Sequence, residues 1–225
     1  MKILITGIDG YVGWPTALRI SKRYPESQII GVDNFGRRRW VEECGAVSAV
    51  PIFSMEERIQ AAKKHGFKNI EFQELDLVNR DDVYLLLQEF RPDVILHLAA
   101  QPSAPYSELN GERANYTQHN NVQGTRNLLW GVKENNLLDS LFVETTTTGI
   151  YGAPEFEIPE GFFEIKFNNR PSARNCFLPC LWVFFNRIRR IFTGGYRNDE
   201  PRKFKLSSKR KGSLRCRLPR RIGIK

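Results

Sequence analysis

The sequence predicts an α/β fold in which a parallel sheet is covered by helices on both faces. Two observations lead to this prediction. Short apolar runs alternate, along the first 150 residues, with longer segments whose apolar residues recur at helical spacing. The first of these runs, Lys2–Thr6, leads directly into a glycine-rich turn. Strands that are separated by helices pair in parallel through right-handed crossovers, which gives a doubly wound sheet.

The expected elements follow from the same patterns. Strands are expected at residues 2–6, 28–32, 70–73, 94–98 and 140–144, and helices at residues 14–24, 55–65, 81–90 and 121–135. The helix that ends at Phe90 is the clearest, because Val83, Leu86, Leu87 and Phe90 form one apolar stripe. The fourth strand is expected to be buried.

The charge of the chain is divided unevenly. The 225 residues carry a net charge of +9. Residues 166–225 hold 18 Lys and Arg side chains against only Asp199 and Glu200, a net charge of +16, so residues 1–165 carry a net charge of −7. We therefore expect a folded domain over residues 1–170, followed by a basic and poorly ordered segment over residues 171–225.

Several classes of protein are excluded by composition. No apolar run reaches the roughly 20 residues that span a bilayer, and the N-terminus lacks the pattern of a signal peptide. Four cysteines are too few for a disulfide scaffold. A cytoplasmic protein without a membrane partner is the expectation. No metal site is predicted, because Cys176 and Cys180 have no paired histidine or second cysteine pair nearby.

The glycine turn has the chemistry of a phosphate-binding site. Gly7, Gly10 and Gly13 allow a tight turn and a close approach to a pyrophosphate, and the following helix offers free N–H groups. Asp33, 20 residues after Gly13, ends the second strand, where a carboxylate accepts hydrogen bonds from ribose hydroxyls. These features predict a Rossmann-type dinucleotide site. Asp33 favours NAD over NADP, although the arginine run at residues 37–39 counts in the other direction. The alternative is an ordinary strand–helix turn.

Two further pairs of residues fit the same site. Asp76 and Leu77 follow the third strand, where the carboxylate would accept a hydrogen bond from the adenine amino group. The alternative for Asp76 is a helix cap shared with Asn79. Ala99 and Ala100 follow the fourth strand, and their small side chains suit a backbone that lies close to the cofactor, or simply tight packing.

Longer motifs indicate a family. The glycine turn, the segment His97-Leu98-Ala99-Ala100 and the segment Asn121-Val122-Gln123-Gly124-Thr125 resemble the extended short-chain dehydrogenase/reductase superfamily, which includes nucleotide-sugar epimerases and dehydratases. Residues 33–38, 101–107 and 116–121 narrow the resemblance to the UDP-sulfoquinovose synthase family. The resemblance covers residues 1 to about 166 and has ended by residue 171.

The resemblance implies a tightly held NAD and assigns residues to it. The implied cofactor-binding residues beyond the glycines, Asp33, Asp76, Leu77 and the two alanines are Tyr11, Val12, Asn34, Arg37, Arg58, Leu98 and Asn121. Gln101 and Ser103 are implied to contact the sugar or sulfite. Pro102 stands where plastid members have arginine, and Ile150 stands where they have glutamate.

The implied reaction joins UDP-glucose and sulfite. C4 of the glucose is oxidised, the C5 proton and the 6-hydroxyl are lost, sulfite adds at C6, and the C4 ketone is reduced again by the NADH formed. Counting back from Tyr151 selects Thr147 among four threonines as the hydroxyl that bonds the C4 oxygen. Without the resemblance, these threonines are a β-prone strand end. From the resemblance we also expect a homodimer and the enzyme class hydrolase.

The catalytic base of the superfamily is not found. That base is a Tyr-x-x-x-Lys pair, and no tyrosine of this sequence has lysine four positions later. A frame-shifted or truncated sequence would explain the missing pair together with the abrupt change in charge. The alternatives are a basic arm that binds nucleic-acid phosphates and a metal or redox element at Cys176 and Cys180.

Three functions therefore stay open. The main expectation is an NAD-dependent enzyme of the UDP-sulfoquinovose synthase type that is inactive as this chain. The rivals are another NAD-dependent sugar-nucleotide epimerase or dehydratase, and a non-catalytic dinucleotide-binding module whose basic tail contacts nucleic acid.

Overall fold

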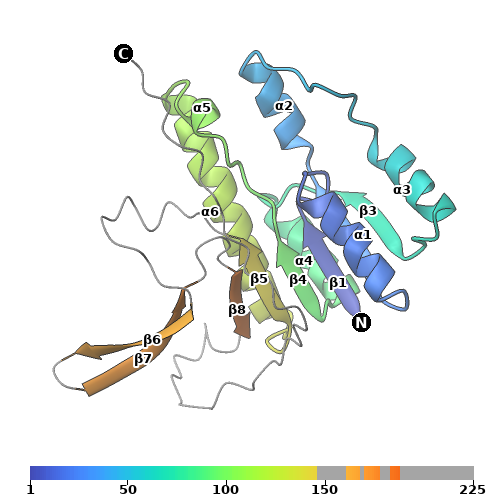
Figure 1. Ribbon diagram of the computed structural model, residues 1–225. Coiled ribbons are helices and arrows are strands. Elements are labelled where there is room, and N and C mark those ends of the chain that lie inside the picture. The colour runs from blue at the N-terminus through green and yellow to red at the C-terminus, as the bar shows by residue number, and fades with distance from the viewer. Residues whose placement is uncertain (146–160, 168–169, 178–182, 188–225) are drawn as a thin grey trace, which may run out of the picture. The chain divides into compact units, whose positions relative to one another are not determined.

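The computed structural model describes residues 1–145 and, as strands, residues 161–167, 170–177 and 183–187 (Figure 1). The strands are β1 (Lys2–Thr6), β2 (Gln28–Asp33), β3 (Ile70–Glu74), β4 (Val94–His97), β5 (Leu141–Thr145), β6 (Gly161–Phe167), β7 (Arg170–Phe177) and β8 (Val183–Arg187). The helices are α1 (Gly13–Arg23), α2 (Gly36–Glu43), α3 (Met55–Lys64), α4 (Arg80–Phe90), α5 (Ala104–Ser107) and α6 (Gly111–Glu134).

The main sheet has the strand order β3-β2-β1-β4-β5-β8. The first five strands are parallel, and β8 pairs antiparallel with β5. The chain runs outward from β1 to β3 and then returns to place β4 on the other side of β1. This reversal leaves a crevice at the carboxyl ends of β1 and β4, which is where open α/β sheets bind their ligands. The predicted doubly wound α/β fold is confirmed. Strands β6 and β7 pair antiparallel as a separate sheet.

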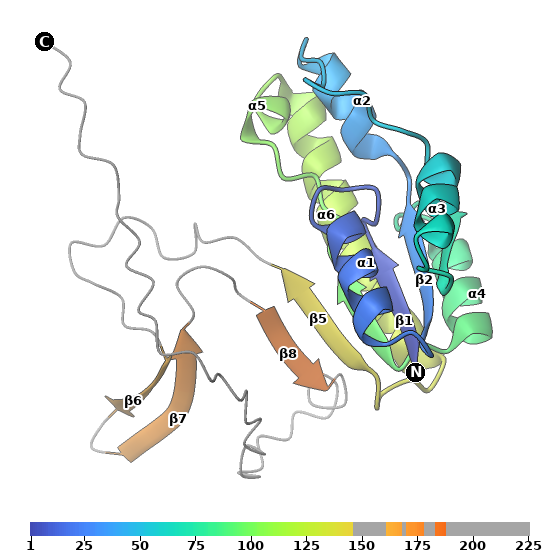
Figure 2. The ribbon, with the colours of Figure 1, turned by 45° about the vertical axis from the view of Figure 1, so that its right-hand side comes forward.

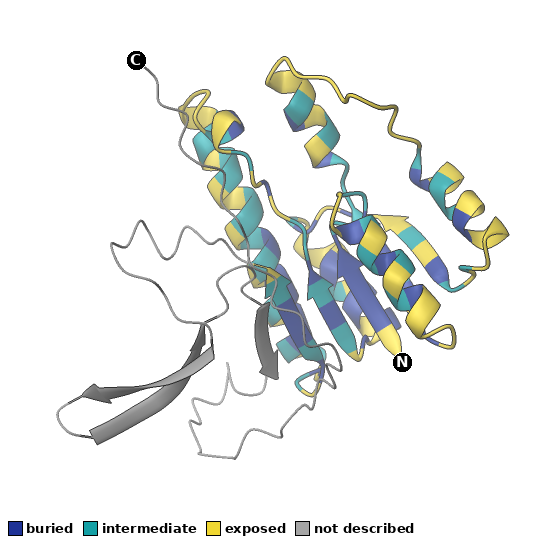
Figure 3. Ribbon diagram, in the orientation of Figure 1, coloured by how far each residue is buried: buried dark blue, intermediate teal, exposed yellow. Residues whose placement is uncertain are grey.

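Helices cover both faces of the parallel strands, as Figures 1 and 2 show. Four consecutive residues of β1, from Ile3 to Thr6, are buried, which is typical of a central parallel strand (Figure 3). Odd-numbered positions such as Ile3 and Ile5 pack toward Ala17 of α1 and Met55 of α3. The even-numbered Leu4 faces the opposite side, toward α4 and α6.

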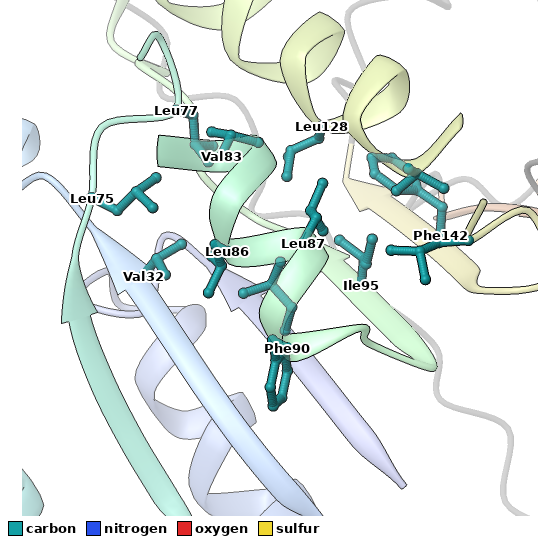
Figure 4. Close-up of a cluster of buried hydrophobic side chains, with 13 residues drawn as sticks. Val32, Leu75, Leu77, Val83, Leu86, Leu87, Phe90, Ile95, Leu128 and Phe142 are labelled. Carbon is teal, nitrogen blue, oxygen red and sulfur yellow. The ribbon is translucent and has the colours of Figure 1, made fainter. Parts of the chain in front are cut away.

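The larger core cluster lies between the sheet and helices α4 and α6. Leu87 is fully buried at its centre, and the predicted apolar stripe of α4 supplies this face (Figure 4). The members of the cluster are Leu4, Val32, Leu75, Leu77, Val83, Leu86, Leu87, Phe90, Ile95, Leu128, Val132, Leu137 and Phe142. This packing fixes the ends of β2 and β4, on which the site is built.

Helix α6 begins at Gly111, ten residues before the predicted start. Its start is set by Asn110, whose side-chain oxygen accepts a hydrogen bond from the Arg113 N–H at 2.9 Å. The first half of the helix is mostly polar, so hydrophobic periodicity does not reveal it. Helices α2 and α5 were also not predicted. They are held near α6 by an aromatic cluster in which Trp40 lies 5.9 Å from the rings of both Tyr106 and Tyr116.

The basic segment is described only in part. Strand β8 and nearly all of β7 lie within residues 171–225, and residues 178–182 and 188–225 lie outside the described part of the chain. The chain divides into compact units at Met1–Gly194 and Gly195–Lys225, so the predicted boundary at residue 170 stays a prediction. Among the described helices, none is both long enough and apolar enough to cross a membrane.

Candidate cofactor site

A cleft of about 1090 Å³ opens at the carboxyl ends of the parallel strands. It is lined by the glycine turn, by the residues that follow β2, β3 and β4, by the end of β5 and by one side of α6. The predicted site residues in its lining are Gly7, Gly10, Tyr11, Val12, Gly13, Asp33, Asn34, Arg37, Asp76, Leu77, Leu98, Ala99, Ala100, Gln101 and Asn121. The fold therefore brings most of the predicted residues to one place.

The glycine turn is too tight for side chains at two positions. Gly7 has φ +75°, and a Cβ atom there would lie 2.7 Å from the backbone nitrogen of Ala99. A Cβ atom on Gly13 would lie 2.1 Å from the carbonyl oxygen of Gly7. The turn thus places backbone without side chains next to the N-terminus of α1, and no side chain caps the first turn of that helix. Uncapped N–H groups at a helix N-terminus are suited to an anion.

Asp33 is fixed at the end of β2 by two backbone donors. Its Oδ2 accepts a hydrogen bond from the Asp9 N–H and its Oδ1 accepts one from the Phe35 N–H, both at 2.9 Å. Burial raises the pKa of the Asp33 carboxyl above its ordinary value, and these N–H donors oppose the rise. The carboxylate keeps further lone pairs toward the cleft, as acceptance of ribose hydroxyls requires.

Asp76 lines the cleft and closes a local turn, while the N-cap position of α4 is occupied by Asn79. The Oδ1 of Asp76 accepts a hydrogen bond from the Val78 N–H at 2.9 Å, which makes it a turn cap. Its Oδ2 accepts one from Asn34 Nδ2 at 3.0 Å, and both side chains line the cleft. On the other wall, the guanidinium of Arg37 lies 5.7 Å from the centre of the Tyr11 ring.

The segment after β4 is tied to α6 by one side chain. Asn121 Oδ1 accepts a hydrogen bond from the Gln101 N–H at 2.8 Å, and Asn121 Nδ2 donates to the Gln101 carbonyl at 3.0 Å. Ser103 accepts a hydrogen bond from the Tyr106 N–H at 3.3 Å and so caps α5. Ser103 is not part of the cleft lining. The structure therefore does not support its predicted contact with the substrate, which stays a prediction.

Gln101 lines the cleft and carries a buried hydrogen-bond donor that is not used within the described residues. The residue is only 2% exposed, and its Oε1 accepts a hydrogen bond from the Ser103 N–H at 3.0 Å. Its Nε2 is buried and has no hydrogen-bond partner. A buried donor without a partner costs about 1–3 kcal/mol. A bound group with an oxygen acceptor would remove this cost.

A buried histidine that the sequence analysis did not single out supports the floor of the cleft. His97 Nδ1 lies 2.8 Å from Thr6 Oγ1, and His97 Nε2 lies 2.9 Å from Thr125 Oγ1. Thr6 Oγ1 already accepts from the N–H groups of the two residues after His97, so its own proton points to Nδ1. The proton of the ring is therefore on Nε2. Burial lowers the pKa of His97 to about 4, which keeps the ring neutral.

Arg58, like Ser103, is a predicted residue that the fold does not bring into the cleft lining, and Thr147 lies outside the described residues. The Nη1 of Arg58 lies 2.7 Å from Asp9 Oδ1 in an ion pair. Ile150 and the four-threonine segment beyond Thr145 also lie outside the described residues. The lining residues that sequence reasoning missed include Asp9, Trp40, His97, Arg126, Trp130 and Glu144. Asp9 inside the glycine motif and His97 at the start of the His97–Ala100 segment are the two of these that lay within motifs of the sequence.

Comparisons with known proteins agree with this geometry. The family model "NAD dependent epimerase/dehydratase family" matches residues 3–173. The chain is similar to a UDP-sulfoquinovose synthase of Sulfolobus acidocaldarius, with 41% identity over 163 residues that cover 72% of this chain and 41% of that protein. It is 38% identical to the chloroplastic UDP-sulfoquinovose synthase of Spinacia oleracea over 172 residues, 76% of this chain and 35% of that protein. The chain thus spans about two fifths of the length of these relatives.

A solved structure supports the fold. The UDP-glucose 4-epimerase of Stenotrophomonas maltophilia, crystallised with NAD and a formylated UDP-arabinopyranose, aligns with a TM-score of 0.53 and 20% identity. The alignment covers 69% of this chain and 40% of that protein. At this identity the likeness is evidence for the fold alone.

One expectation is corrected and the family is established. The enzyme class hydrolase is wrong, because the matched family comprises epimerases and dehydratases, and a dTDP-glucose 4,6-dehydratase is among the similar structures. The predicted cofactor, NAD, is confirmed by the family match. The glycine turn, the carboxylate of Asp33 and the matched residues together place this chain in the NAD dependent epimerase/dehydratase family.

Proposed function

We propose that residues 1–170 bind NAD for an NAD-dependent nucleotide-sugar enzyme of the UDP-sulfoquinovose synthase type. The observation that carries the proposal is the continuity of the cleft. The cleft is lined by the glycine turn and Asp33 and also by Gln101, whose buried Nε2 has no hydrogen-bond partner. One bound dinucleotide and a neighbouring sugar nucleotide would occupy such a cleft.

The residues present fit NAD. A Cβ atom on Gly7 or Gly13 would collide with neighbouring backbone, so glycine permits the tight turn that a pyrophosphate-binding loop needs, and the fixed carboxylate of Asp33 suits the adenosine ribose. Asp76 and Asn34 would meet the adenine, and Ala99, Ala100 and Leu98 would lie along the cofactor. NAD supplies a hydride acceptor when it is bound. The residues of the chain would orient the cofactor.

The substrate end is assigned to Gln101 and Thr147. The Nε2 of Gln101 would donate to an oxygen of the sugar or of sulfite, because it is the buried donor in the described part of the chain that lacks a partner. Thr147, which lies outside the described residues, would hydrogen-bond the C4 oxygen of the sugar. Identities of 41% and 38% to UDP-sulfoquinovose synthases, against 28% to a UDP-glucose 4-epimerase of Drosophila melanogaster, favour UDP-glucose and sulfite as substrates.

These 225 residues alone are expected to bind NAD weakly and to lack turnover. Removal of the C4 hydroxyl proton needs a base, and the sequence contains no Tyr-x-x-x-Lys pair to supply it. A hydroxyl such as that of Thr147 shares a hydrogen bond but does not accept a proton at neutral pH. The homodimer that the resemblance implies stays a prediction.

The test is product analysis with the purified chain and with the same chain fused in frame to the C-terminal half of the archaeal relative. Each is incubated with NAD and UDP-glucose, with and without sulfite. The proposal predicts a sulfite-dependent UDP-sulfosugar from the fusion and none from the chain alone. UDP-galactose formed without sulfite would identify an epimerase instead, and a sulfosugar from the chain alone would refute the predicted inactivity.

A further inference from the structure

A buried carboxylate inside the glycine turn occupies two arginines from the neighbouring helices. The side chain of Asp9 is 7% exposed. Arg38 of α2 donates to it through Nε at 2.9 Å and through Nη2 at 2.6 Å. Arg58 of α3 donates to the same carboxylate through Nη1 at 2.7 Å. Three hydrogen bonds from two guanidinium groups therefore converge on one aspartate.

The same aspartate is linked to the predicted ribose-binding carboxylate. The Asp9 N–H donates to Asp33 Oδ2 at 2.9 Å, and both residues line the cleft. The two arginines do not line it. Each is held on its other side by a ring, because the guanidinium of Arg58 lies 4.6 Å from the centre of the Trp14 ring and that of Arg38 lies 5.1 Å from that of Phe35. Two positive and two negative charges balance in this cluster.

This arrangement bears on the phosphate that distinguishes NADP from NAD. Arginine binds phosphate through its planar fork of N–H donors, and Rossmann-type sites use an arginine near the end of β2 for the 2′-phosphate. Arg38 lies five residues after the end of β2 and belongs to the arginine run that counts toward NADP in the sequence. Its fork is already closed on Asp9 in bidentate fashion.

We infer that Asp9 is a specificity-determining residue, which favours NAD over NADP by withholding Arg38 and Arg58 from a 2′-phosphate. The inference rests on the proposed function in one respect, that the cleft takes a dinucleotide. Asp33 repels the 2′-phosphate directly, whereas Asp9 removes the cations that would compensate for that repulsion. Of the other two arginines of the run, Arg39 is also occupied, because it donates to the Asn34 carbonyl at 2.9 Å, whereas Arg37 lines the cleft beside the Tyr11 ring.

The experiment compares dissociation constants for NAD and NADP by titration calorimetry on the full 225-residue chain. Asp9→Asn keeps the size of the side chain but removes one charge, and its Nδ2 turns an N–H donor toward Arg38 Nε. The ratio Kd(NADP)/Kd(NAD) is expected to fall at least tenfold. Asp81→Asn is the matched control, because it removes the same charge from an exposed aspartate–arginine pair outside the cleft and leaves the ratio unchanged.

The alternative hypothesis is that the Asp9 cluster only stabilises the packing of the glycine turn against α2 and α3 and has no effect on cofactor choice. In that case Asp9→Asn weakens both cofactors equally, and an unchanged ratio overturns the inference. Arg38→Gln gives a second test if the first variant does not fold. An arginine that is withheld contributes nothing to NADP binding, so Kd(NADP)/Kd(NAD) of Arg38→Gln is expected to stay within twofold of the wild-type ratio. A selective fivefold loss of NADP affinity in this variant would overturn the inference. The failure of wild type to bind NAD would instead overturn the proposed function.

Discussion

Alanine at Gly13 tests the physical basis of the site, because its Cβ atom has no space in the glycine turn. The atom would lie 2.1 Å from the Gly7 carbonyl oxygen and 2.7 Å from the Ile8 Cα. Cβ atoms essentially never approach within 3.0 Å of such neighbours, so the first contact must lengthen by 0.9 Å, the difference between 3.0 and 2.1 Å. Both neighbours are backbone atoms, and neither can rotate away.

The movement cannot stay local. The Gly7 N–H donates to the Val32 carbonyl at 2.8 Å, which fixes the turn to the end of β2. Overpacking of this kind costs about 3 kcal/mol of unfolding free energy. A displaced turn also loses backbone N–H contacts to the pyrophosphate, each worth roughly 1.5–3 kcal/mol. Two such contacts correspond to a loss of NAD affinity of at least about 100-fold.

Two other glycines provide graded controls. A Cβ atom on Gly10 would lie 3.2 Å from the Gly7 oxygen, so small adjustments accommodate Gly10→Ala and we expect a cost below about 1 kcal/mol. Gly111 has open space, and Gly111→Ala should leave stability unchanged or raise it by about 0.5 kcal/mol. Urea unfolding followed by circular dichroism and titration calorimetry with NAD measure both effects. The reasoning is refuted if Gly13→Ala binds NAD within threefold of wild type.

Three further predictions concern stability. The unfolded chain binds a proton at His97 near pH 6.5 that the folded chain, with a pKa of about 4, does not bind; stability present above pH 6.5 is therefore lost as the pH falls toward 4, by about 3 kcal/mol. His97→Gln should flatten that slope in urea titrations at successive pH values, and parallel slopes would contradict the assignment. Leu87→Ala empties the centre of the larger core and should cost about 2–5 kcal/mol of unfolding free energy, with a loss below about 1 kcal/mol arguing against this core. Ser54→Ala removes the capping box of α3 and should lower the melting temperature by a few degrees, corresponding to about 1 kcal/mol, whereas Ser48→Ala on an exposed loop should not.

The sequence was sufficient for the elements that carry their own periodicity. Strand β1 and helix α4 appear within one residue of their expected limits, because a central parallel strand is a continuous apolar run and α4 has one apolar stripe. The first half of α6 escaped prediction for the opposite reason. Its neighbours there are the aromatic rings of α2 and α5, and such tertiary contacts leave no periodic signal in a polar segment.

In the candidate site, too, some residues were predictable from the sequence and others were not. Asp33 and the glycines were found because backbone geometry dictates glycine at a fixed spacing from the strand end. The partners of those residues were not found. His97 joins Thr6 to Thr125 over 91 and 28 residues of sequence, and Asp9 joins arginines 29 and 49 residues away. Only the fold brings residues at such separations together.

Arg58 reaches the glycine turn but lies outside the cleft lining. The motif match assigns Arg58 to the adenosine end of the site, and α3 does bring it to the glycine turn. There, its guanidinium pairs with the carboxylate of Asp9, which lines the cleft, whereas Arg58 itself does not. Asp9 is itself bonded through its N–H to Asp33. Under the proposed function, Arg58 would act on the ribose-binding carboxylate of Asp33 only through Asp9, whose charge it balances.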